Sequence, residues 1–184
     1  MRANLVIRRS RREDLGRIMP VYEEAKSYMR KEGNMTQWTG GYPSEEVILK
    51  DIAEGNHYII EKDGAESSIE TDGSGYIEGA DGKGELVGVF TFIIGDDPTY
   101  KVIDGAWPNE NPYGTIHRIA STGKERGLLR KCVDFCFGLI PEIRIDTHSD
   151  NRTMLAAIES LGFQKCGIIR LADGSPRTAF QKSK

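Results

Sequence analysis

The chain has 184 residues, of which 38% are hydrophobic and 29% charged, and its formal net charge is -3. A chain of this length buries enough surface to form one domain, 1–184, without disulfides or metals. The acidic balance argues against a nucleic-acid partner. The longest apolar run, Leu86 to Ile94, is too short to span a membrane, and the first residues lack the apolar run of a signal peptide. We therefore expect a cytoplasmic protein with no membrane partner.

The first third of the chain predicts a short strand and two helices. The strand covers 5–8. Ser10 and Glu13 then form the pattern of a capping box, in which each side chain satisfies a backbone donor of the other residue. Apolar residues with helical spacing follow this box. A second helix is expected from Ser44, a typical N-cap residue, to about Glu54.

The middle of the chain predicts a hairpin that is interrupted by a long insertion. Its strands are His57 to Glu61 and Leu86 to Ile94. The segment between them, about 63–85, contains six glycines and seven carboxylates. This composition cannot form a core, so we expect a flexible acidic, glycine-rich insertion within the domain.

The remaining elements alternate between strands and helices. Two β-α-β units follow the hairpin, and this order implies a mixed sheet covered by helices. The expected elements are a strand at 114–120, a helix at 124–137, a strand at 142–147, a helix at 151–160, a strand through Ile169 and a last strand at 177–181.

Three cysteines, Cys132, Cys136 and Cys166, form neither a C-x-x-C pair nor a set with a histidine pair. We expect them to be buried and reduced, and we expect no metal site.

The segment from Arg118 to Lys131 is rich in basic residues and joins a predicted strand to a predicted helix. The free amides of a helix start and its dipole can bind an anion. A solvated helix start in an acidic protein explains the same pattern. The nucleotide-triphosphate loop G-x-x-x-x-G-K-[ST] is absent from the sequence.

A second pattern lies downstream, where a strand ends in polar residues and a short helix ends in Leu-Gly-Phe. Asn151 at the helix start, together with Gly162 and Phe163, resembles the GNAT superfamily of acyl-CoA-dependent N-acetyltransferases. The segment from Lys124 to Leu129 is similar to the family's pyrophosphate loop, [Q/R]-x-x-G-x-[G/A]. The resemblance implies an α/β (α+β) fold with a mostly antiparallel sheet of about six to seven strands flanked by about four helices.

The resemblance also implies acetyl-CoA as the acyl donor. Ile119, Ala120 and Ser121 would face the pantetheine arm, and Asn151 would lie near the cofactor. The diphosphate would contact Lys124, Glu125, Arg126, Gly127, Leu128 and Leu129. Leucine has the same backbone donor as glycine, so a Leu129 that packs on the core leaves the loop usable. A Leu129 that turns into the loop would weaken cofactor binding.

Catalysis needs a base for the amine and an acid for the departing thiolate. The family's frequent tyrosine acid corresponds to Ile158, so other residues must act here. We select His117, because histidine titrates near neutral pH, and Tyr113. His117 and Arg118 alternate along a strand, so one of them is expected to face the cleft, although a packed histidine is the alternative. Further candidates are His148, Asp104 and Glu110.

Aromatic residues in predicted loops can line an acceptor pocket. We select Trp38, Tyr42 and Trp107 for this role, although each could instead cover an end of the core.

These residues support two functional hypotheses. The first is an N-acetyltransferase that moves an acetyl group from acetyl-CoA to a small-molecule or peptide primary amine by direct attack. The alternative is a catalytically weak or inactive acyl-CoA-binding sensor or assembly module on the same fold. Because this family often pairs, the resemblance also implies a homodimer as one assembly.

Overall fold

The structure is a computed structural model that describes residues 5–62 and 84–184, so the insertion predicted at 63–85 lies almost wholly outside the described residues. The helices are α1 (Leu15–Lys31), α2 (Glu45–Ala53), α3 (Leu128–Phe137) and α4 (Arg152–Ser160), with 3-10 helices η1 (Arg12–Asp14) and η2 (Pro98–Tyr100). The strands are β1 (Leu5–Arg9), β2 (His57–Lys62), β3 (Glu85–Ile94), β4 (Asp104–Gly105), β5 (Gly114–Ser121), β6 (Glu142–Thr147), β7 (Gln164–Arg170) and β8 (Pro176–Ser183).

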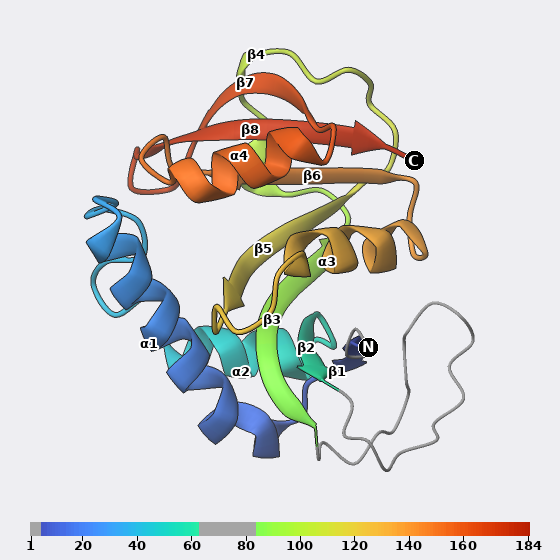
Figure 1. Cartoon of the computed structure of the whole chain (residues 1–184). Helices are drawn as coiled ribbons and strands as arrows, with labels where there is room; N and C mark the ends of the chain where they lie inside the picture. The colour runs from blue at the N-terminus through green and yellow to red at the C-terminus, as the bar shows by residue number, and fades with distance from the viewer. Residues whose placement is uncertain (1–4, 63–83) are drawn as a thin grey trace.

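One sheet joins these strands in the order β1-β2-β3-β5-β6-β8-β7-β4 (Figure 1). Among the described strand pairs only β5 and β6 run parallel. The predicted mixed, mostly antiparallel sheet with four α-helices is therefore confirmed. The sheet has eight strands instead of six to seven, because β4 adds a two-residue edge that pairs Gly105 with Gly167. Two residues are too few to produce a strand pattern in the sequence.

Alternating side chains of the central strands form a separate core on each face of the sheet. Ile60 belongs to the cluster beneath α3 and α4, whereas its neighbour Ile59 belongs to the cluster beneath α1 and α2. Figure 1 shows α3 and α4 together on the near side of the sheet. The two faces of the sheet therefore carry different helices. None of the described helices is long and apolar enough to cross a membrane.

Helix starts follow the sequence where a local cap is present and depart from it where tertiary contacts compete. Ser44 caps α2 as predicted, since its hydroxyl accepts a hydrogen bond from the Val47 amide at 3.4 Å. The capping box assigned to Ser10 and Glu13 is wrong. The carboxylate of Asp14 accepts from the Arg11 amide at 2.8 Å, and the hydroxyl of Ser10 contacts His57 instead.

The predicted helix start at Lys124 is also wrong, because α3 begins at Leu128 after Gly127. Gly127 has a φ of 77°, a left-handed conformation that glycine adopts without steric cost. Residues 124–127 therefore belong to the loop that precedes the helix.

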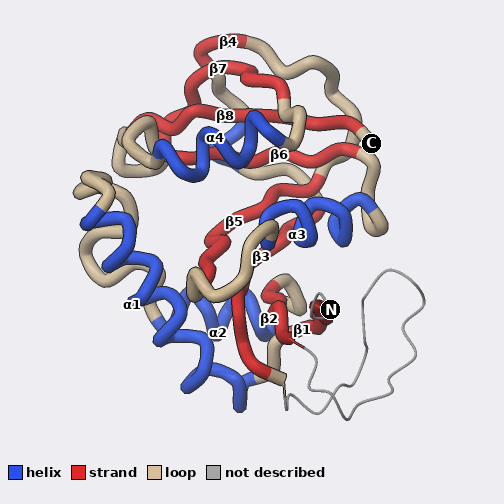
Figure 2. Tube along the Cα trace, viewed as in Figure 1, coloured by secondary structure: helices blue, strands red, loops and turns tan. Residues whose placement is uncertain are grey.

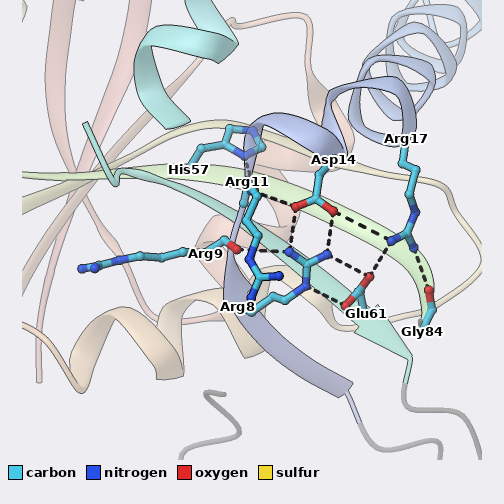
Figure 3. A network of polar contacts seen from close by, with 9 residues as sticks. Arg8, Arg9, Arg11, Asp14, Arg17, His57, Glu61 and Gly84 are labelled. Carbon is cyan, nitrogen blue, oxygen red and sulfur yellow. Dashed lines mark hydrogen bonds and ion pairs between the residues drawn. The ribbon is translucent and has the colours of Figure 1, made fainter. Parts of the chain in front are cut away.

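A buried ionic network ties β1 to β2 and to the start of α1 (Figure 3). The Arg8 guanidinium donates to both Asp14 oxygens, at 2.7 and 2.8 Å, and to Glu61 at 3.0 Å. Arg17 adds an ion pair with Glu61 at 3.0 Å. Burial opposes ionisation of Asp14, but hydrogen bonds from Arg8 and Arg11 lower its pKa on balance. Removing one partner of such a network leaves the other charge buried and uncompensated. The network therefore fixes β1, β2 and the start of α1 relative to one another.

Candidate active site

The central feature of the site is a divergence between β5 and β6. These strands pair only over three positions, from Gly114 opposite Ile143 to Ile116 opposite Ile145. Beyond Ile116, β5 follows β3 and β6 follows β8. Figure 2 shows the two strands turning away from each other. Their facing edges therefore leave backbone groups without a ladder partner at the middle of the sheet.

A β-bulge shapes the free edge of β5. His117 pairs with Thr91 and Ala120 pairs with Val89, so two residues, Arg118 and Ile119, stand opposite one. Arg118 has a φ of 49°, which is uncommon for a residue other than glycine. The bulge interrupts the alternation of the strand, and His117 and Arg118 both line the adjoining cavity. The expectation that one of the two would face the cleft was too narrow.

A chain of buried hydrogen bonds that begins at Tyr22 of α1 supports the bulge. Tyr22 donates its hydroxyl hydrogen to the Arg118 carbonyl at 3.0 Å and contacts His57 Nε2 at 3.1 Å. Because the hydroxyl has one hydrogen, Nε2 must carry a proton and donate it to Tyr22. His57 Nδ1 is then the acceptor for Ser10 Oγ at 2.6 Å. Burial, followed by the charge of Arg118, lowers the pKa of His57 to about 3, so the ring is neutral.

A cavity of about 1100 Å³ opens at the divergence and extends along both faces of the sheet. On one side it is walled by the starts of α3 and α4, and on the other by α1, η2 and the turn between β7 and β8. The predicted site residues on its wall are Trp38, Tyr42, His117, Ile119, Ala120, Ser121, Arg126, Leu128, Leu129 and Asn151. Residues far apart in the sequence therefore meet in one hollow.

The loop before α3 presents free amides to this cavity. The first hydrogen bond of α3 runs from the Lys131 amide to the Gly127 carbonyl, so the Leu128, Leu129 and Arg130 amides have no helical partner. Within residues 5–62 and 84–184 no other partner is recorded for them. The amides of Gly123 and Lys124 do have partners, at 3.0 and 3.5 Å, in the preceding Ser121 and Thr122 hydroxyls.

The two leucines leave the helix start accessible. Leu128 belongs to the core cluster under α3 and α4, and Leu129 packs against the same cluster. Other parts of the loop turn outward, since Lys124 pairs with Glu85 at 2.8 Å and Glu125 pairs with Lys62. Lys124, Glu125 and Gly127 do not line the cavity. Any anion at this helix start would thus meet backbone amides and Arg126.

Asn151 connects the cavity to the start of α4. Its side-chain oxygen caps that helix by accepting from the Met154 amide at 3.2 Å. Its amide group donates to Gln37 at 3.1 Å, in the loop after α1. The residue therefore fixes the position of two cavity walls.

His117 forms a dyad with Asp97. Its Nε2 donates to Asp97 Oδ2 at 3.0 Å, and the two side chains are 20% and 15% exposed. Burial opposes ionisation of Asp97, but the hydrogen bonds from His117 and from the Thr99 amide lower its pKa to about 2. The carboxylate is therefore ionised at neutral pH and orients the imidazole. The remaining nitrogen, Nδ1, has no recorded hydrogen-bond partner among the residues described and is free to accept a proton.

A second pair lies beside this dyad. The Tyr100 hydroxyl donates to Asp146 Oδ1 at 2.6 Å, and both residues line the cavity. Burial raises the pKa of Asp146, and the hydrogen bond from Tyr100 partly offsets this effect. Sequence reasoning missed Asp97, Tyr100 and Asp146. A signal for Asp146 was present, because a carboxylate in the apolar strand I-R-I-D-T is costly to bury without a function or a partner.

Trp38 and Tyr42 come from the loop between α1 and α2. Trp38 lies edge-on to Tyr22, with 5.7 Å between ring centroids. The Tyr42 hydroxyl accepts a hydrogen bond from Arg118 at 2.8 Å, while the same guanidinium binds both oxygens of Asp51. These aromatic residues therefore cover the cavity next to the bulge.

Tyr113 and Trp107 lie elsewhere. Their rings enclose the Arg144 guanidinium, which is 3.7 Å from the Tyr113 centroid and 3.9 Å from the Trp107 centroid. The Tyr113 hydroxyl accepts from the Asp97 amide at 2.9 Å, and its ring borders a separate hollow of about 320 Å³. Neither residue lines the large cavity. This placement gives no support to Tyr113 as a catalyst or to Trp107 as an acceptor contact.

The other candidates are also placed apart from the dyad. His148 lines the cavity but bonds Thr36 at 3.1 Å near the α4 start, Asp104 lies in the edge strand β4, and Glu110 borders the smaller hollow. The free cysteines are buried, and no group of metal-ligating side chains occurs in the described part of the chain.

Comparison with solved structures identifies the family. A GNAT-family acetyltransferase from Streptococcus agalactiae 2603 is 31% identical over 98% of this chain and 95% of its own, with a TM-score of 0.79. A GNAT-family acetyltransferase from Listeria monocytogenes 4b F2365 has 18% identity over 100% and 99% of the two chains and a TM-score of 0.67. The NatC complex, solved with a Gag peptide and CoA, shares the fold at 14% identity over 98% and 99% of the chains and a TM-score of 0.52.

A scan against protein-family models and a search of curated proteins gave no match. The structural relative at 31% identity nevertheless spans nearly all of both chains. The chain belongs to the GNAT family of acetyltransferases.

Proposed function

We propose that this protein transfers an acetyl group from acetyl-CoA to a primary amine by direct attack. The observation that carries the proposal is the meeting, in one cavity, of a free strand edge, an open helix start and the Asp97–His117 dyad. Each part matches one requirement of acyl transfer to an amine, namely a place for the donor, a place for its charge and a base.

The chemistry of the cavity wall suits a CoA thioester. The free amides at the start of α3 and the guanidinium of Arg126 suit a diphosphate. The unpaired edge of β5, over Ile119 to Ser121, offers backbone donors and acceptors to an extended amide-bearing arm. Asn151 closes the same wall from α4. When bound, acetyl-CoA would supply the activated acyl group, and the protein would supply position and proton transfer.

The dyad provides the proton transfer. Attack needs a neutral amine, which forms when the ammonium releases one proton to solvent. As the amine nitrogen attacks, His117 Nδ1 takes a second proton from that nitrogen while Asp97 stabilises the resulting imidazolium. A bond forms between the amine nitrogen and the acyl carbon, and the bond from that carbon to sulfur breaks. The proton held by His117 can then neutralise the thiolate. No redox step is needed, and the products are an acetamide and CoA.

Release of free thiol from acetyl-CoA in the presence of an amine panel tests this function, and calorimetry measures binding separately. We expect binding in the micromolar to millimolar range and thiol release that depends on an amine. Tight binding without thiol release from any amine would favour the alternative of a CoA-binding sensor. No binding at millimolar acetyl-CoA would contradict both hypotheses.

A further inference from the structure

Buried and half-buried arginines in this protein are compensated in different ways, and one of them contacts neither a carboxylate nor an aromatic ring in the described residues. Arg8 contacts two carboxylates, and Arg118 binds one carboxylate through two nitrogens. Arg144 lies between two aromatic rings. Arg177 is 8% exposed, yet it forms no ion pair with the described residues. Arginine is rarely buried to this extent unless an anion or a ring compensates it.

The contacts of Arg177 use only part of its donor capacity. Its Nη1 donates to the Pro176 carbonyl at 2.9 Å and to Ser175 Oγ at 3.3 Å. Both acceptors are neutral. A guanidinium has five N–H donors in a planar fork, and no acceptor is recorded within the described residues for Nε or Nη2. The N–H groups of Nε and Nη2 therefore remain available to donate to a ligand.

Strand register places Arg177 beside the proposed catalytic groups. Asp146 of β6 pairs with Ala179 of β8, and Arg177 precedes Ala179 by two residues, so their side chains emerge from the same face. Diagonal neighbours of this kind lie about 7–8 Å apart in an antiparallel pair. Arg177, Asp146 and His117 all line the large cavity. Burial raises the pKa of Asp146, and the charge of Arg177 partly offsets this rise, which agrees with their proximity.

This end of the cavity therefore presents a cation without an ion pair in the described residues. Close to it lie two carboxylates of the inner wall, Asp97 and Asp146, the exposed carboxylate of Asp173 and a candidate base, His117. A ligand that complements it carries a single negative charge a few ångströms from an amine. A carboxylate matches the planar fork of one guanidinium with two parallel hydrogen bonds. A doubly charged phosphate would be disfavoured by the nearby carboxylates of Asp97, Asp146 and Asp173.

We infer that the acetyl acceptor is an amino-acid-like molecule, whose carboxylate binds Arg177 while its amine lies at the Asp97–His117 dyad. This inference rests on the proposed acetyl transfer and names its acceptor class. Arg177 lies on the face opposite α3 and α4, where the donor's phosphates are proposed to bind, so its partner is the acceptor and not the donor. Arg177 acts in specificity and takes no part in proton transfer.

The test uses sets of amines that differ only in the carboxylate. Glycine, L-alanine and L-phenylalanine are compared with their amides and with phenethylamine, by thiol release from acetyl-CoA. We expect the carboxylated amines to have a kcat/KM about 10- to 100-fold higher than their amides, the size of a lost charged hydrogen-bond pair. Arg177→Met should remove this preference by raising KM for the acids, with kcat for the amides nearly unchanged. Arg177→Lys should restore part of it.

Arg170→Met is the matched control. Arg170 is an exposed arginine of β7, next to the same turn, and its side chain bonds only the Gly174 carbonyl among the described residues. Its removal changes the net charge equally and should leave the preference intact. Calorimetry of each variant with acetyl-CoA alone should give unchanged affinity.

Three results would overturn the inference while leaving acetyl transfer standing: turnover of amides equal to that of the acids, an equal loss for every substrate in Arg177→Met, or weaker acetyl-CoA binding in that variant. If no amine releases thiol, the melting temperature of the CoA-loaded protein, measured with each of the same compounds, still tests whether the acids bind. A rise in melting temperature with the amides but not with the acids, or with neither, would contradict the inference. Absence of thiol release together with a shift by the acids would count against the proposed function alone.

Discussion

At the scale of single residues, the Asp97–His117 contact predicts that His117 is the base that takes the proton from the amine. His117→Gln keeps a polar side chain but removes the base, so we expect kcat to fall about 10²- to 10⁴-fold with little change in acetyl-CoA affinity. Asp97→Asn should reduce kcat less, because the imidazole loses its orienting carboxylate but remains present. Thiol-release kinetics and calorimetry measure the two quantities.

Asp96→Asn is the control for these variants, since Asp96 is the exposed neighbour of Asp97 and lies off the large cavity. It should retain full activity. Full activity of His117→Gln would instead assign base catalysis to another group, with Asp146 as the next candidate.

His57 makes stability depend on pH. Its pKa is about 3 in the folded protein against an ordinary value of 6.5, because burial and then Arg118 disfavour its charged form. Between these pH values the unfolded chain binds a proton that the folded chain does not. The stability is complete above pH 6.5 and is lost as the pH falls toward 3. The loss from this group between pH 7 and 4.5 should be about 2–3 kcal/mol.

Urea unfolding of the wild type and of His57→Gln at both pH values measures this effect. The variant should be less stable at pH 7, because the contacts to Ser10 and Tyr22 change, but its stability should fall less on acidification. His148→Gln is the control and should keep the wild-type dependence on pH. Equal pH dependence in His57→Gln and the wild type would contradict the buried neutral ring.

At the scale of elements, the start of α3 depends on Gly127. Its φ of 77° disfavours any side chain, although a Cβ at this position would meet no atom within 4 Å. Gly127→Ala should therefore cost about 1–2 kcal/mol in conformational strain alone. If the helix start relaxes to avoid the strain, its amides move, and we expect acetyl-CoA to bind several-fold more weakly. Urea unfolding and calorimetry measure the two effects.

Gly16→Ala in α1 is the matched control, since Gly16 has open space around it and lacks a positive φ. It should be neutral or stabilising. Unchanged acetyl-CoA affinity in Gly127→Ala would argue that the phosphates bind elsewhere in the cavity.

Elements with local signals could be predicted from the sequence, and those defined by tertiary contacts could not. Ser44 and Asn151 are helix caps whose side chains mark a boundary by themselves. The edge strand β4 exists only through its pairing with β7, and the start of α3 is set by the loop that precedes it. For the site, the motif from Lys124 to Asn151 indicated the cavity wall near α3 and α4.

The acceptor side could not be found in this way. Tyr100 lies in η2 and Asp97 is the N-cap of that helix, and they reach His117 and Asp146 only because a long connection folds back onto the sheet. No local pattern encodes that return. The same long-range packing moved Tyr113 and Trp107 onto Arg144 and away from the large cavity.

At the scale of the whole molecule, the cavity lies between two parts of the sheet that share only the short β5–β6 pairing. A donor that contacts both α3 and α4 would connect these parts. With acetyl-CoA at 100 times its Kd, the free energy of unfolding should rise by about 2.7 kcal/mol. Thermal unfolding with and without acetyl-CoA measures this, and adenosine at the same concentration is a control that lacks the diphosphate. An equal shift with adenosine would contradict binding through the α3 start.

The divergence of β5 and β6 also has a kinetic consequence. Because the opening is lined from both faces of the sheet, two reactants can enter from opposite sides, and neither has to leave before the other arrives. No cysteine lies on the cavity wall to store the acyl group between two half-reactions. Double-reciprocal plots of initial velocity, with donor and acceptor both varied, should accordingly give intersecting lines, as they do for a ternary complex. Parallel lines would instead indicate that CoA leaves before the acceptor binds.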